Sequence, residues 1–148
     1  MTIGLMPSRS NPADFDTVTL TVATAKYGSV LTKVGETTHD GAHITTTAGE
    51  QPSGVCNSQG DPNNSGLFAI GAVVSMARGG DAEVLFDAGT VLTVGAKIIA
   101  SGTDGTAKVL EAETDPYWLL GTSNEDRTIG ASPGLASVRL SIQWIAKD

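Results

Sequence analysis

Two histidines are the first candidates for metal chemistry in this chain of 148 residues. They are its only histidines and lie four positions apart in the segment His39-Asp40-Gly41-Ala42-His43. Imidazole and carboxylate groups can bind a transition metal. Histidines spaced i and i+4 share a face only on a helix, whereas Gly41 and the Thr-rich surroundings favour a loop. The pattern therefore predicts a solvated loop and no metal site.

A second segment, Asp61-Pro62-Asn63-Asn64-Ser65-Gly66, imitates the first half of a calcium loop. It has oxygen-bearing side chains at positions one, three and five and a glycine at position six. A calcium loop also needs a bidentate Glu at position twelve, and Ala72 stands there, at the end of an apolar stretch. We therefore expect a hydrated turn without a bound cation.

Acidic residues gather in two further places, and each group could in principle hold a divalent cation. The first group recurs at every second position, which on a strand puts the carboxylates on one face. The groups are Glu111, Glu113 and Asp115, and Asp81, Glu83 and Asp87. Charges on an exposed strand edge also discourage aggregation, so we expect solvated acidic edges.

Motifs for nucleophilic and nucleotide chemistry are missing from the sequence. It contains no Gly-x-Ser-x-Gly elbow, no Gly-Lys dipeptide of a phosphate-binding loop and no G-x-G-x-x-G fingerprint. We therefore expect no enzyme, no catalytic residue and no cofactor. A small hydrolase using Asp81 or Glu111 stays open as a third hypothesis, because two carboxylates can converge in space from distant segments.

Cysteine and aromatic residues are scarce. Cys56 is the only cysteine, so an internal disulfide or a Cys-x-x-Cys zinc site cannot form, and a small buried hydrophobe is expected. Aromatics make up 5% of the chain, which disfavours the aromatic platforms of sugar-binding clefts. We expect Trp118 and Trp144 in the core or in a subunit interface.

Length and charge exclude several classes of protein. The length fits one domain of roughly 150 residues, which we divide into an N-terminal arm, residues 1–12, and one β-rich domain, residues 13–148. The formal charge of −7 would repel a phosphate backbone, so nucleic-acid binding is disfavoured. The longest apolar run, residues 67–74, is far shorter than the ~20 residues of a membrane span, so no membrane partner is expected.

The elements that must position these residues are predicted to be short strands. Val18, Leu20 and Val22 alternate with threonines, which indicates a half-buried strand. Further strand-length runs end at glycines, and residues 36–66 are expected to be loops with short strands. The expected strands are residues 17–22, 29–34, 67–77, 83–86, 91–94, 97–101, 106–110, 117–120 and 138–143.

The clearest turn is Gly102-Thr103-Asp104-Gly105, between two strand-length runs. Asp-Gly tolerates the positive φ angles of a tight connection, so a hairpin is expected. Residues 11–14 could cap one short helix and residues 125–129 could hold a turn of another, but the absence of sustained helical periodicity favours strands. The fold class that follows is all-β, a small β-barrel or β-sandwich of short strands with Gly-rich turns and an extended N-terminal arm.

The order of small-residue motifs resembles that of tailed-phage capsid decoration proteins, also called head cement proteins. In that family a strand leads to a glycine, then an Ala-Gly-x-x-(Leu/Val)-x-x-Gly segment follows, then a Gly-rich hairpin, and a Leu-x-Gly precedes the last strand. The matching segments are Val74 to Val84, Ala88-Gly89-Thr90-Val91-Leu92-Thr93-Val94-Gly95, Gly102 to Val109, Leu119-Leu120-Gly121 and Val138-Arg139-Leu140. The resemblance covers about residues 71–140; Gly95-Ala96 stands where the family often has Gly-Asp.

What the resemblance implies is a structural virion protein. It would be made in the host cytoplasm, assemble as a homotrimer and bind the outer surface of the mature capsid. There it would reinforce the contacts between subunits of its partner, the major capsid protein.

The N-terminal arm is the segment that we expect to grip the shell. Ile3, Leu5 and Met6 are apolar yet precede any periodic element, so they could become ordered on contact; a frayed terminus without function is the competing interpretation. The alternative function is a carbohydrate- or ligand-binding β module whose site is the loop of residues 36–66.

Overall fold

The computed structural model describes residues 14–34, 41–111 and 116–146, and strands dominate these ranges. One 3-10 turn, η2 (Pro62–Asn64), interrupts them. The strands are β1 (Asp14–Leu20), β2 (Val30–Lys33), β3 (Gly41–Ile44), β4 (Gly54–Cys56), β5 (Val73–Phe86), β6 (Val91–Leu92), β7 (Lys97–Ala100), β8 (Ala107–Val109), β9 (Tyr117–Ser123), β10 (Arg127–Thr128) and β11 (Gly134–Ile145). The predicted all-β class is confirmed.

Two closed rings of strands share β5. The first, which we call the N-terminal barrel, runs β1-β3-β2-β4-β5 and closes where β5 pairs with β1. The second, the C-terminal ring, runs β5-β11-β9-β7-β8 and closes through one parallel pair, Phe86 with Ala107. Of the two architectures left open by the sequence, the barrel is therefore the observed one.

A wall of three strands divides the two cores. Neighbouring side chains on a strand point to opposite faces, and in β2, β4 and β5 both faces are apolar. Leu31, Cys56 and Met76 face the core of the N-terminal barrel. Their neighbours Val30, Val55 and Ala77 belong to the core of the C-terminal ring, and all six side chains are fully buried. We call these strands the dividing wall.

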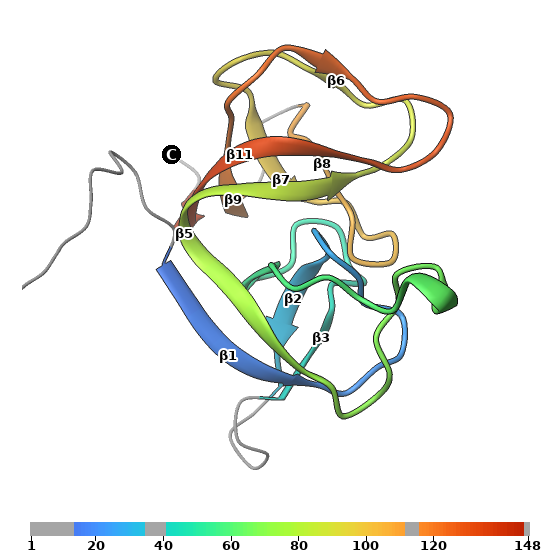
Figure 1. Ribbon diagram of the computed structural model, residues 1–148. Helices are drawn as coiled ribbons and strands as arrows, with labels where there is room; N and C mark the ends of the chain where they lie inside the picture. The colour runs from blue at the N-terminus through green and yellow to red at the C-terminus, as the bar shows by residue number, and fades with distance from the viewer. Residues whose placement is uncertain (1–13, 35–40, 112–115, 147–148) are drawn as a thin grey trace, which may run out of the picture.

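β5 continues through Gly79-Gly80, where the sequence pattern predicted a stop. Asp14 of β1 pairs with Gly79 and Phe15 pairs with Ala77, so the register shifts and Arg78 is left as an extra residue. Such a bulge bends a strand, and Gly80 supplies a positive φ of 75°. Figure 1 shows the resulting bend, with β1 beside the first half of β5 and β11 beside the second.

Three other expectations about the elements were wrong. Arg127–Thr128 form β10, which pairs with β6, so the helical turn considered at residues 125–129 is not present; residues 11–13 of the other turn lie outside the described residues. The strand expected at residues 67–77 begins only at Val73. β9 runs through Gly121, because that glycine allows close approach to Arg139 on β11 and does not end the strand.

The predicted hairpin is confirmed and joins the two rings. β7 pairs with β8 through Ile98–Val109 and Ala100–Ala107, and Asp104 and Gly105 of the turn have positive φ angles. The carbonyl of Gly105 accepts a hydrogen bond from the backbone N–H of Val30, at 2.7 Å. The tip of the hairpin is thereby fixed to the dividing wall.

We predict that Gly121→Ala strongly destabilises the protein. A Cβ at this position would overlap the carbonyl oxygen of Arg139, so β9 and β11 would have to separate. Overpacking of this kind costs about 1–3 kcal/mol or more. Chemical denaturation measures the loss, and Gly130→Ala is the matched control because a Cβ there meets no atom within 4 Å. Equal stability of the two variants would contradict the prediction.

Candidate functional site

The segments weighed as candidate metal sites give no cluster of ligands in the part of the chain that the structure describes. His39 and Asp40 lie outside the described residues, and Nδ1 of His43 lies 2.7 Å from the carbonyl oxygen of Ile44. Among the described residues, no group of three or more His, Cys, Asp or Glu side chains could hold a metal ion.

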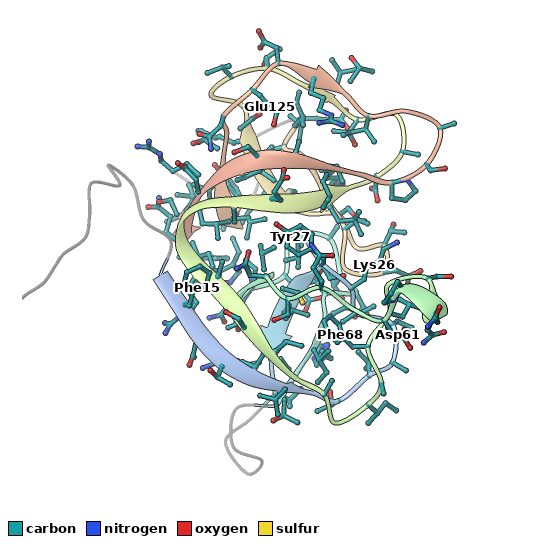
Figure 2. The ribbon with its side chains drawn as sticks, in the orientation of Figure 1. Phe15, Lys26, Tyr27, Asp61, Phe68 and Glu125 are labelled. Atoms are coloured by element: carbon teal, nitrogen blue, oxygen red, sulfur yellow. The ribbon has the colours of Figure 1, made fainter. Side chains whose placement is uncertain are left out.

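The calcium-like segment forms the expected turn. The carboxylate of Asp61 accepts a hydrogen bond from the backbone N–H of Asn63, at 2.9 Å, and caps η2. Ser65 then turns the chain with a φ of 57°. Figure 2 shows Asp61 beside this turn at the edge of the molecule. Its carboxylate therefore stabilises the local backbone.

The acidic groups are dispersed. Glu111 is exposed after β8, while Glu113 and Asp115 lie outside the described residues. Oδ1 of Asp81 accepts a hydrogen bond from the Asn124 amide, at 3.1 Å. Asp87 is half-buried rather than a fully solvated edge residue, and it accepts hydrogen bonds from two hydroxyls of the β7–β8 hairpin, Ser101 and Thr106.

Cys56 is a buried residue of the core, as predicted. Its side chain is fully buried in β4, and burial raises the pKa of its thiol. Since the thiolate is the reactive form of cysteine, this environment favours a packing role over a nucleophilic one.

The two tryptophans form a pair on the surface of the C-terminal ring. Trp118 on β9 and Trp144 on β11 are directly opposite in the register, and their ring centroids are 5.5 Å apart at an angle of 54°. Trp144 is 51% exposed, so it is not a core residue. The half-exposed pair provides a large apolar surface with indole N–H donors.

A cleft of about 350 Å³ opens beside this pair, at the junction of the two rings. We call it the seam cleft. Its walls come from the lead into β4, the bulge of β5 and the ends of β2, β9 and β11. The lining residues are Lys33, Gln51, Pro52, Ser53, Arg78, Trp118 and Ile142.

Asp16 organises the charges at the edge of the seam cleft. Its carboxylate accepts a hydrogen bond from Nζ of Lys33 at 2.7 Å, and the guanidinium of Arg78 lies 3.8 Å away. The hydrogen bond from Lys33, followed by that from the Thr17 N–H, lowers the pKa of Asp16. The carboxylate therefore stays ionised, and its ion pair links the side chain at the end of β2 to β1 across the intervening β3.

A second and larger cleft, of about 630 Å³, lies between other segments of the two rings. Its walls include Tyr27, Leu85, Pro133 and Leu135, and burial, with a smaller contribution from Glu83, raises the pKa of the Tyr27 hydroxyl. Figure 2 shows Tyr27 where the two halves of the molecule meet, across the bend of β5 from Phe15. We call this cleft the Tyr27 groove.

Sequence reasoning missed the seam cleft. Its residues come from five separate segments, and no spacing in the sequence brings Arg78 to Trp118 or to residues 51–53. The only signal was indirect, because residues 51–53 belong to the loop proposed as an alternative binding site.

The predicted shell-contact residues, Ile3, Leu5 and Met6, lie outside the described residues. The described chain begins at Asp14, which pairs with Gly79 next to Arg78.

We predict that Asp16→Asn removes part of the acid sensitivity of the fold. The pKa of Asp16 is lowered in the folded state, so its stabilising contribution is present above the unfolded pKa of about 3.9. It is lost as the pH falls through the lower folded pKa. Denaturation between pH 7 and pH 2 tests this, with Asp104→Asn as the matched change of charge.

A double-mutant cycle of Asp16→Asn with Lys33→Met should give a coupling free energy between the two side chains of about 0.2–1 kcal/mol at pH 7. Zero coupling would contradict the role of Asp16.

Comparison with known proteins gives a likeness of fold. No family model and no curated protein matches the sequence. In the described part of the chain, no helix has the length and apolar character needed to cross a membrane. The structure is similar to the N base of head fiber gp8.5 of bacteriophage phi29, with a TM-score of 0.58 and 15% sequence identity. The match covers 88% of this chain and 95% of that chain, so nearly the whole described fold is shared.

Proposed function

We propose that this protein is a structural protein of a bacteriophage virion. It binds the outside of the mature head and reinforces contacts between major-capsid subunits. The observation that carries the proposal is the fold shared with the base of a phage head fiber, over 88% of this chain. The order of Gly-based motifs, which resembles that of capsid decoration proteins, supports the same class independently.

The chemistry of the described side chains supports a structural role. Cys56 is buried in the core, Asp87 is bonded to hairpin hydroxyls, and His43 lies against the carbonyl of Ile44. Each of these groups serves the fold itself. The shared β5 and the dividing wall make a stiff body, as a protein that braces a shell needs.

Binding to the mature shell stabilises that shell by mass action. A protein that binds only the expanded form adds about 2.7 kcal/mol per site at a concentration of 100 times Kd. A homotrimer that contacts several capsid subunits would gain further through avidity. The trimer is part of our proposal, on the basis of the family resemblance.

The test is cosedimentation of the purified protein with bare heads of its source phage. We expect saturable binding to expanded heads and none to unexpanded heads at the same salt concentration, because only the expanded lattice presents the complete site. Binding to neither kind of head would contradict the proposal. Saturable binding of neutral glycans by the isolated protein would instead favour the alternative, a carbohydrate-binding β module.

We also predict that the N-terminal arm contributes to shell binding. Deleting residues 1–10 removes Ile3, Leu5 and Met6 but none of the residues that form the three described core clusters. We expect the denaturation midpoint to stay unchanged and the affinity for expanded heads to fall. An unchanged affinity would exclude the arm. Replacing Ile3, Leu5 and Met6 together by serine separates the apolar side chains from the length of the arm.

A further inference from the structure

Arg78 is the most available cation of the seam cleft. As the extra residue of the β5 bulge, it projects a side chain that is 51% exposed. Its guanidinium lies 3.8 Å from Asp16, which is longer than a hydrogen bond, and the short contact of that carboxylate is with Lys33 at 2.7 Å. Because a guanidinium carries five N–H donors, Arg78 can bind a second carboxylate in bidentate fashion.

The surroundings of Arg78 supply apolar contact area. Trp118 lines the seam cleft, Trp144 packs on Trp118, and half of the Trp144 surface faces solvent. Phe15, 49% exposed, lies on β1 opposite Ala77, the residue before Arg78. Tryptophan and arginine are the residue types most often found at the energetic centre of protein interfaces.

Charge complementarity indicates what binds there. The chain carries nine basic and sixteen acidic residues, so most of its surface repels an acidic partner. The seam cleft brings two of the nine cations, Lys33 and Arg78, into one lining, and Asp16 at its edge pairs closely with Lys33 alone. An acidic segment would therefore be steered to this cleft and away from the rest of the surface.

We propose that the seam cleft is the docking site for an acidic segment of the major capsid protein. A carboxylate of that segment pairs with Arg78, and its apolar neighbours pack on Trp118 and Trp144. This inference rests on the proposed function and names the contact surface for it. A small ligand would need only the cleft of about 350 Å³. The exposed aromatic side chains of Trp144 and Phe15 lie outside that cleft and offer additional contact area, which favours a protein segment as the ligand.

The experiment compares two variants that lose the same charge. Arg78→Gln removes the more exposed cation of the seam cleft, and Arg127→Gln removes an exposed arginine on β10 that lines the Tyr27 groove instead. We expect Arg78→Gln to weaken binding to expanded heads by about 10- to 100-fold and to reduce its salt dependence. Arg127→Gln should stay within about twofold of the wild type.

A second pair of variants tests the apolar part of the site. Trp144→Ala should weaken binding to heads by about tenfold or more. Ile70→Ala is the control, because Ile70 is 68% exposed but lies outside the seam cleft. Denaturation midpoints of all four variants, together with near-ultraviolet circular dichroism, show whether the folds are equally intact.

The outcomes separate this inference from the proposed function. If the wild-type protein binds expanded heads and Arg78→Gln binds equally well, or no more weakly than Arg127→Gln, the docking site is wrong while the function stands. If the wild-type protein binds no heads, both are overturned. A third outcome is that the isolated wild-type protein binds oligogalacturonate and the Arg78→Gln variant does not. This result would reassign the cleft to acidic saccharides and overturn the docking proposal.

Discussion

Burial on both faces of the dividing wall is the constraint on which the rest of the structure depends. Leu31 and Val30, neighbours in β2, contribute to different cores, and so do Cys56 and Val55 in β4. Complete burial of such an aliphatic side chain contributes about 1.5–3 kcal/mol. Neither ring can therefore open without exposing apolar side chains of the other, and the two rings form one body.

The bend in β5 follows from this arrangement and creates the seam cleft. One strand can serve two rings only if it changes direction between them, and the bulge at Arg78 with the glycines after it allows that change. The same bulge turns Arg78 outward at the junction of the rings. The seam cleft is thus a geometric consequence of sharing β5, and the bulge places Arg78 in it.

Local sequence patterns correctly predicted those elements whose conformation depends on residues nearby in the sequence. The alternation of Val18 and Leu20 with threonines predicted β1, and Asp104-Gly105 predicted the β7–β8 hairpin. The errors arose where a distant segment decides the conformation. Gly79-Gly80 and Gly121 were interpreted as strand ends because the sequence does not show that β1 and β11 pair with β5 at Gly79-Gly80, or that Arg139 approaches Gly121 closely.

By itself, the sequence determined the all-β class, the buried role of Cys56 and the solvated turn at Asp61. Each of these follows from residue types and a spacing of a few positions. Only the tertiary structure decided that the strands form two rings around a shared β5 and that Arg78 meets Trp118 in one cleft. The physical reason is that strand order and bulge position depend on packing between residues far apart in the chain, for which a single sequence carries no periodic signal.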